Sequence, residues 1–207
     1  VGSTTTKAVL LRKSDQALLA SIYLRTNGDP IGASRKCYAR ILEQIHKQVE
    51  LSDISIIGLG VCGSGRQIAG LHAITDCVIN EIIAHATAAV YFDPRVDTIF
   101  EIGGQDAKYT YITNGVPSDY AMNEACSAGT GSFLDQQANR IGISIEDEFG
   151  ELSLKSKDPP RIAGRCSVFA KSDMIHLQQI ATPVHDIVAG LCFAVARNFI
   201  SSLGRGK

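Results

Sequence analysis

The pattern of apolar and polar residues predicts alternating strands and helices in the first half of the chain. Short strand-like apolar segments at the start are joined by a polar turn, which predicts a hairpin. Farther on, apolar side chains recur every four positions, as on one face of an amphipathic helix. An Ile- and Val-rich run then predicts a buried strand. The predicted strands are at residues 7–12, 17–24, 54–61 and 76–79. The predicted helices are one at 34–49, one that begins directly after the glycine turn 62–66, and one at 82–91.

The second half repeats the order of strands followed by helices. The patterns predict strands at 98–102, 108–113 and 118–122, helices at 127–140, 167–179 and 184–203, and a polar connection at 155–164. Pro94 restricts Asp93 and ends the preceding helix, so we expect a boundary there between a first lobe, residues 1–93, and a second lobe, residues 94–207. Tandem modules of three strands and a helix suggest an α/β fold of the ribonuclease-H-like type, duplicated.

A glycine-containing turn occurs twice at corresponding positions. When Lys7 is aligned with Lys108, Gly2 falls on Gly103, 101 residues later, and each run leads into a strand-like segment. Small residues at such a turn let backbone N–H groups approach phosphate oxygens. Neither run is a Walker loop, and the dinucleotide-binding glycine pattern does not follow a strand. The repeat predicts a two-lobed phosphate binder.

Composition narrows the function classes. The formal net charge of −1 in 207 residues gives no electrostatic reason to expect a nucleic acid or an anionic membrane as partner. The longest apolar runs are far shorter than a membrane span. Six widely spread cysteines without a C-x-x-C pair would be compatible with disulfides in a secreted protein, but the alternating α/β pattern favours a cytoplasmic protein with reduced thiols. The chain begins inside the first motif, so we expect a fragment that is truncated at both ends.

Four segments carry a specific resemblance to a known family. They are Gly2–Lys7, Glu101–Lys108, residues 122–131 (Met-Asn-Glu-Ala-Cys-Ser-Ala-Gly-Thr-Gly) and residues 166–173 (Cys-Ser-Val-Phe-Ala-Lys-Ser-Asp). They resemble the activators of 2-hydroxyacyl-CoA dehydratases and the ATPase subunits of benzoyl-CoA reductases, within the superfamily of acetate and sugar kinases, heat-shock chaperones and actin. The resemblance implies an actin-like ATPase fold, with two lobes around a nucleotide cleft. It departs from the superfamily at Glu101, where Asp is more usual.

The resemblance also implies a set of nucleotide-site residues for ATP or ADP with Mg²⁺. The catalytic candidates are Glu81, at the start of an alanine-rich helix, Glu101 and Gln105. The candidates for cofactor binding are Gly2, Ser3, Thr4, Thr5, Lys7, Gly103, Gly104, Gln105, Asp106 and Lys108. The superfamily's adenosine-binding glycine pair is absent from these 207 residues.

Two cysteines are the candidate metal ligands. Cys126 and Cys166 each stand where a loop gives way to a predicted helix, and helix N-termini favour a thiolate. A cubane iron–sulfur cluster needs four cysteine thiolates, so one chain would supply two of them and a homodimer all four. The resemblance implies such a [4Fe–4S] cluster on the dimer axis. A shared zinc ion, or two buried cysteines without chemistry, are the alternatives at this point.

The predicted function follows from that resemblance. An ATP-dependent reductive activator takes an electron from ferredoxin or flavodoxin and passes it to an acyl-CoA dehydratase or reductase. A small-molecule kinase of the N-acetylglucosamine type shares the glycine turns, but it needs a general base near its acceptor hydroxyl. A non-enzymatic switch of the actin or chaperone type is the third alternative. The kinase alternative gives no role to Cys126 or Cys166.

Overall fold

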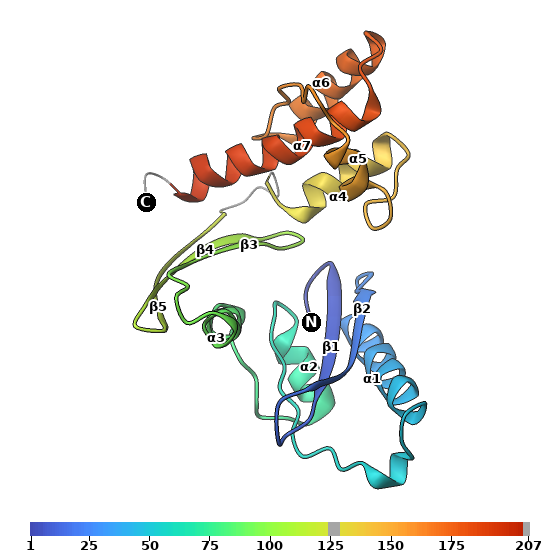
Figure 1. The fold of residues 1–207 in the computed structure, drawn as a ribbon, viewed down its shortest axis with the longest axis vertical. Coiled ribbons are helices and arrows are strands. Elements are labelled where there is room, and N and C mark those ends of the chain that lie inside the picture. Colours follow the sequence, from blue (N-terminus) through green and yellow to red (C-terminus); the bar gives the residue numbers. More distant parts are fainter. Residues whose placement is uncertain (124–128, 205–207) are drawn as a thin grey trace. The chain divides into compact units, whose positions relative to one another are not determined.

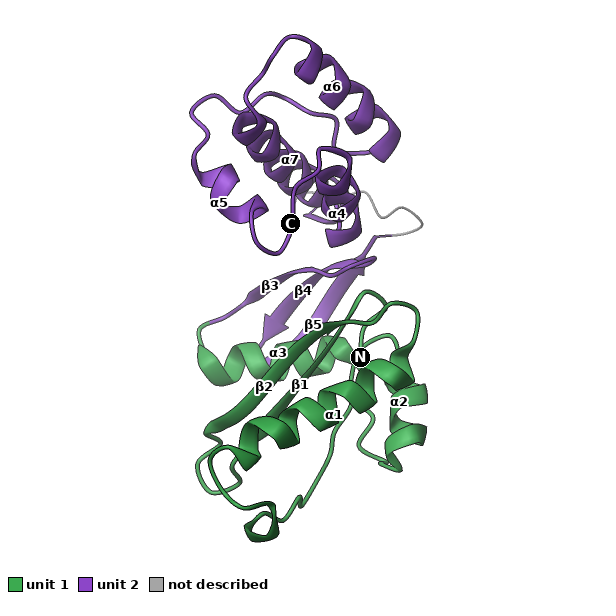
Figure 2. Ribbon diagram, turned by 90° about the vertical axis from the view of Figure 1, so that its right-hand side faces the viewer, with its two compact units in different colours: residues 1–95 green, residues 96–207 purple. Residues whose placement is uncertain are grey.

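The chain forms two compact units in a computed structural model that describes residues 1–123 and 129–204. The units are Val1–Arg95 and Val96–Lys207 (Figure 2). Each has its own sheet and its own helices, as the apolar pattern predicts. The assignment of the units to the two lobes of a duplicated fold stays a prediction.

The first unit is built on an antiparallel hairpin covered by one helix. Strands β1 (Thr5–Leu11) and β2 (Leu18–Arg25) pair from Thr5 opposite Arg25 onward, and α1 (Pro30–His46) packs against both strands (Figure 1). The core between hairpin and helix contains Ala20, Ile41 and Ile45. Asp29 starts α1 because its side chain accepts a hydrogen bond from Gly32 N at 2.8 Å, with Pro30 at the first helical position.

Three short elements complete this unit. They are the 3₁₀ turn η1 (Leu51–Asp53), α2 (Arg66–Ala73) and α3 (Glu81–Phe92). Asn80 begins α3, since its Oδ1 accepts the backbone N–H of Ile82 at 2.9 Å. Glu81 therefore occupies the first helical position, where a carboxylate also interacts favourably with the helix dipole.

The predicted strands at 54–61 and 76–79 are wrong. Of these segments only Val61 and Val78 pair within the described residues, in one isolated parallel bridge, and Ile56 and Ile57 are 58% and 66% exposed. The apolar pattern describes side chains, whereas a strand also needs a neighbour that accepts its backbone hydrogen bonds. In the described part of the chain β1 pairs only with β2, so residues 54–60 lack a ladder to join.

The second unit contains a three-stranded antiparallel sheet of order β3-β4-β5. The strands are β3 (Thr98–Ile102), β4 (Ala107–Thr113) and β5 (Val116–Met122). Asn114 and Gly115, with φ of 53° and 78°, turn the chain between β4 and β5. Positive φ at both residues is the signature of the two-residue turn whose twist matches a hairpin.

The described remainder of this unit is mostly helical. The helices are α4 (Gly131–Arg140), α5 (Phe149–Leu154), α6 (Ser167–Gln179) and α7 (Val184–Phe199), which continues as a π-helical turn, η2 (Ile200–Gly204). α4 is shorter than predicted: it begins after Thr130, and residues 124–128 lie outside the described part.

Helix α7 is the centre of the helical core. Ile187, Leu191 and Ala194 are fully buried and pack with Phe133 of α4 and Met174 of α6. The run Val184–Gly204 is long and apolar enough to cross a membrane by length and composition, yet 56% of an apolar 18-residue window within it is buried inside the protein. Its packing in the core accounts for that apolar composition.

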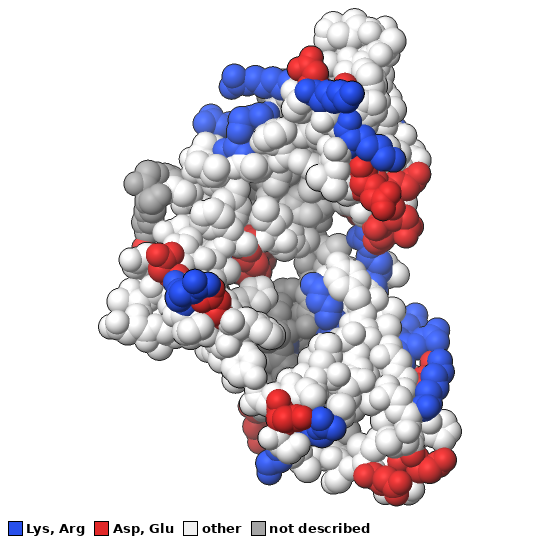
Figure 3. Space-filling view, viewed as in Figure 1, with Lys and Arg blue, Asp and Glu red and all other residues white. Residues whose placement is uncertain are grey.

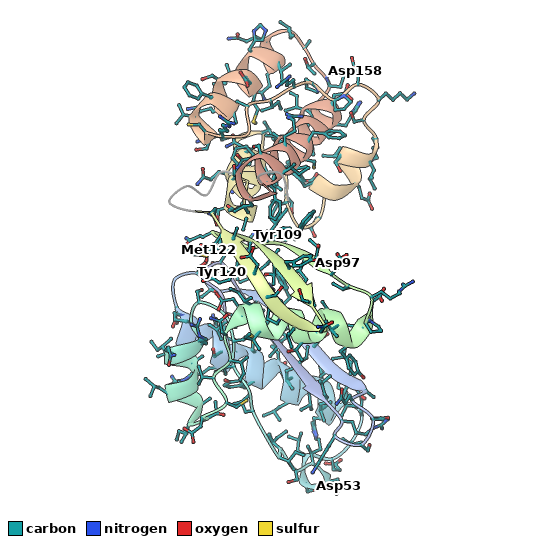
Figure 4. All side chains as sticks on the ribbon, turned by 90° about the vertical axis from the view of Figure 1, so that its left-hand side faces the viewer. Asp53, Asp97, Tyr109, Tyr120, Met122 and Asp158 are labelled. Atoms are coloured by element: carbon teal, nitrogen blue, oxygen red, sulfur yellow. The ribbon has the colours of Figure 1, made fainter. Side chains whose placement is uncertain are left out.

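The sheet of the second unit packs against the end of α7. Tyr109 of β4, labelled in Figure 4, lies in a buried cluster with Ala107, Phe199 and Leu203. Phe100 of β3 packs against Phe199, with the two rings tilted by 48° and their centroids 5.1 Å apart. These contacts fix the strands that carry the second glycine turn to the helical core. Charged side chains of both signs are spread over both units on the face in Figure 3, in keeping with the small net charge.

Candidate functional site

The first glycine turn is closed by a backbone hydrogen bond across its ends. Gly2 N donates to Thr5 O at 3.0 Å, and a Cβ at position 2 would lie 2.9 Å from that oxygen, so the position requires glycine. Thr26, the residue after β2, holds the turn from the side: its hydroxyl donates to Gly2 O at 2.8 Å and its N–H to Thr4 O at 2.9 Å. The turn is therefore fixed to the hairpin.

The second turn has the same closure at the corresponding residues. Gly103 N donates to Asp106 O at 2.8 Å, and a Cβ at position 103 would lie 2.7 Å from that oxygen. Asn123, directly after β5, accepts from Ala107 N at 2.7 Å and donates to Gln105 O at 3.2 Å. The two runs that align in sequence thus share a backbone arrangement and a polar anchor from the next strand.

The second turn is also bonded to the start of α4. Gly131 N donates to Gly103 O at 2.8 Å, and Ser132 N donates to Gly104 O at 2.7 Å. The first N–H groups of a helix have no acceptor within the helix, and here the carbonyl oxygens of the turn accept their hydrogen bonds. A Cβ at Gly131 would lie 3.1 Å from Gly103 O, so glycine permits this approach. Movement of the turn must therefore move the beginning of α4.

The two aligned lysines have different surroundings. Lys108 is buried, and its Nζ lies 3.2 Å from Oε1 of Glu101, the residue opposite it on β3. Lys7 is exposed and lies over the ring of Tyr23, 5.0 Å from its centroid. The structure brings Glu101 and Lys108 together beside the second turn, whereas Lys7 packs on its own hairpin.

Glu81 is held by an ion pair with Arg66. The distance from Arg66 Nη1 to Glu81 Oε2 is 2.9 Å, and the side chains are 27% and 18% exposed. Of the other predicted phosphate-binding residues, Ser3 and Gln105 are exposed, and Thr4, Thr5, Gly104 and Asp106 are half-buried in the two turns. The catalytic and phosphate-binding roles of all these residues stay predictions.

Cys166 has the environment of a stabilised thiolate. It is the N-cap of α6, where the backbone N–H groups of Phe169 and Val168 at the start of the helix favour the thiolate and hold the pKa of Cys166 below its ordinary value. Cys126 lies outside the described residues. Within residues 1–123 and 129–204, no three His, Cys, Asp or Glu side chains cluster closely enough to hold a metal ion.

The thiolate environment predicts site-selective alkylation. In protein freed of metal, we expect iodoacetamide to modify Cys166 at a lower pH than Cys37 or Cys192, because burial raises the pKa of both of those thiols. A lowered pKa means that the reactive thiolate is already present when the pH is below the ordinary thiol value. Mass spectrometry of the labelled peptides across a pH series measures the three midpoints. A Cys166 midpoint at or above that of Cys37 would contradict the assignment.

The sequence alone assigned no role to four residues that shape the site. Thr26 and Asn123 anchor the two turns, Gly131 admits the second turn to α4, and Arg66 holds Glu81. The sequence offered one signal for Thr26 and Asn123. Each can form hydrogen bonds and stands directly after a strand, β2 or β5, and that strand pairs with the one that begins just after the glycine turn. No comparable signal marked the pairing of Arg66 with Glu81.

The fold and its two matching glycine turns define an ATPase of the actin-like class. The chain belongs to the BadF/BadG/BcrA/BcrD ATPase family, which it matches over residues 1–207. Its similarity to solved structures confirms the predicted α/β fold class. Component A of (R)-2-hydroxyglutaryl-CoA dehydratase from Acidaminococcus fermentans has a TM-score of 0.84 and 32% identity, covering 100% of this chain and 76% of that one. An activator of 2-hydroxyisocaproyl-CoA dehydratase from Clostridium difficile, solved with bound ADPNP, has a TM-score of 0.81 and 31% identity, covering 100% and 74%.

Curated relatives point to the same kind of protein. The (R)-2-hydroxyglutaryl-CoA dehydratase activating ATPase of Acidaminococcus fermentans is 33% identical over 205 residues, which are 99% of this chain and 75% of the relative. One of the subunits of benzoyl-CoA reductase from Thauera aromatica is 26% identical, covering 95% and 68%. The predicted resemblance to dehydratase activators and benzoyl-CoA reductase subunits is confirmed.

Proposed function

We propose that this protein is an ATP-dependent reductive activator of an acyl-CoA dehydratase or reductase in the cytoplasm. The proposal takes its general class from the ATPase family and from relatives that activate CoA dehydratases. The observation that carries it further is the pair of hydrogen bonds from Gly131 N and Ser132 N to the carbonyls of Gly103 and Gly104. They join a turn of phosphate-binding type to the helix that follows Cys126 in the chain.

The two turns bind the nucleotide in this proposal. Backbone N–H groups of Gly2–Thr5 and Gly103–Gln105 donate to phosphate oxygens, and a Mg²⁺ ion is held largely through water. Lys108 brings a buried positive charge beside the second turn, where Glu101 holds its ammonium group. Glu81 and Gln105 orient the attacking water. Phosphoryl transfer needs mainly such positioning and charge stabilisation from the protein.

Cys166 fits the role of an iron–sulfur ligand. It stands at the N-terminus of α6, where the backbone N–H groups of Phe169 and Val168 lower its pKa; such a position stabilises a thiolate or the sulfides of an anionic cluster. Cys126 and Cys166, with the same cysteines of a second copy, would hold a [4Fe–4S] cluster on a dimer axis. Such a cluster supplies one-electron transfer, from ferredoxin or flavodoxin to the acyl-CoA enzyme.

The hydrogen bonds between the second turn and α4 give nucleotide state a route to the cysteines. A ligand that shifts the Gly103–Asp106 turn must move Gly131 and Ser132, because their N–H groups are bonded to it. Such a ligand shifts the equilibrium between two arrangements of the turn and α4 only as far as its affinities for the two arrangements differ.

The test compares two nucleotide states of the full-length, anaerobically purified protein. We expect the rate at which bathophenanthroline removes iron to differ several-fold between the ADP-bound and the ATP-bound protein. Glu81→Gln should keep ATP binding but lose ATP turnover, whereas Glu43→Gln, which breaks an exposed pair with Arg40, should lose neither. Iron release and phosphate release are measured in parallel. Equal release of iron in both states, with full turnover in Glu81→Gln, would favour a kinase or a passive cluster carrier.

A further inference from the structure

The ion pair between Arg66 and Glu81 differs from three exposed ion pairs in the described part of the chain. Arg12 with Asp15, Arg40 with Glu43, and Arg95 with Asp93 are exposed neighbours two or three residues apart. Arg66 and Glu81 are 15 residues apart, both side chains are mostly buried, and they join the starts of α2 and α3. Removing one partner of a buried pair weakens the hold on the other more than removing a partner of an exposed pair does. The pair therefore constrains the Glu81 side chain in a way that exposed pairs do not.

Arg66 is itself fixed to the turn that precedes α2. The same Nη1 that contacts Glu81 also donates to Gly63 O at 3.1 Å. Gly63 has a φ of +94°, and a Cβ there would lie 2.6 Å from Val1 O, so only glycine fits. The guanidinium thus takes its position from a turn with little conformational freedom.

That turn is bonded to the residue before Gly2. Gly65 N donates to Val1 O at 2.8 Å. A continuous set of contacts therefore runs from the Gly2–Thr5 turn through residues 63–65 and Arg66 to the carboxylate of Glu81. Every member of this set lies in the first unit.

We propose that Arg66 is a positioning residue that sets the Glu81 carboxylate relative to the first phosphate-binding turn. A glutamate at the first position of a helix has several allowed rotamers, and the charge-assisted hydrogen bond selects one of them. Arg66 acts through Glu81 and has no contact with nucleotide in this scheme. The inference rests on the proposed function, in which Glu81 orients the attacking water.

The variants Arg66→Gln and Arg66→Lys test the proposal in the full-length protein. Arg66→Gln is expected to lower kcat for ATP hydrolysis about 10- to 100-fold, because small misplacement of a catalytic group has effects of that size. The Kd for ATP should stay within about threefold of the wild-type value, because the interactions that bind the ground state and the transition state equally are retained. Arg66→Lys, which keeps the charge, should recover part of kcat. Arg95→Gln, which breaks an exposed pair, is the control and should match the wild type.

A double variant separates positioning from a general structural role. If Arg66 acts only through Glu81, then Arg66→Gln combined with Glu81→Gln should hydrolyse ATP at the rate of Glu81→Gln alone. A further loss in the double variant, or full kcat in Arg66→Gln, overturns the inference while the proposed function stands. Should Arg66→Gln unfold, the same comparison is made with Arg66→Lys. Full activity in Glu81→Gln overturns both the inference and the catalytic role of Glu81.

Discussion

Cys166→Ala is expected to yield a colourless protein with essentially no bound iron or acid-labile sulfide. Two chains would supply four thiolates to one cluster, so the substitution removes two of the four ligands at once. The lowered pKa of Cys166 at the start of α6, against the raised pKa values of Cys37 and Cys192, is the structural reason to expect Cys166 and not those two to be a ligand beside Cys126. Anaerobic iron and sulfide analysis, with the visible spectrum, measures the loss.

Cys37→Ala is the matched control for that experiment. Cys37 is 1% exposed inside α1, and its sulfur lies 3.9 Å from Thr6 O, so the change removes core volume without touching the proposed ligands. We expect full iron content and a lower Tm. Stoichiometric zinc without sulfide in the anaerobic wild-type protein would instead identify a shared zinc site.

Gly104→Val is expected to weaken ATP binding about 100-fold or more. A branched side chain at the second turn would stand where phosphate oxygens approach the backbone, and losing even one or two charge-assisted hydrogen bonds has an effect of this size. Isothermal titration of the full-length protein with ATP and Mg²⁺ measures the change.

The choice of glycine and of control matters in that test. Gly103→Val would distort the turn itself, because its Cβ would lie 2.7 Å from Asp106 O. Gly58→Val introduces the same side chain where a Cβ meets nothing within 4 Å, so its ATP affinity should equal that of the wild type. Unchanged affinity in a folded Gly104→Val protein would remove the second turn from the nucleotide site.

Local pattern was sufficient for those elements whose partners are adjacent in sequence. The β1–β2 and β4–β5 hairpins follow from the order of apolar and turn residues, because each strand pairs with the next strand along the chain. The run 54–61 was misassigned for the opposite reason: its strand character depends on a distant backbone partner that side-chain pattern does not reveal.

The candidate site shows the same limit. Repetition located both glycine turns, and the structure gives them the same closing hydrogen bond. Repetition also suggested equal roles for Lys7 and Lys108, yet one is exposed beside Tyr23 and the other is buried beside Glu101. The difference comes from the cross-strand neighbour, which is set by register. Arg66 was missed because an ion pair between two helices depends on tertiary packing.

The anchors Thr26 and Asn123 have a consequence for the order of folding. Each follows the last residue of its strand, so it reaches its turn only after the hairpin has paired along its whole length. Isolated hairpins form within about 1–10 μs, but partial pairing leaves these two residues without their bonds. During refolding, the ability to bind nucleotide should therefore arise later than the bulk of the strand signal. A sheet that is nearly complete would still have an unformed nucleotide site.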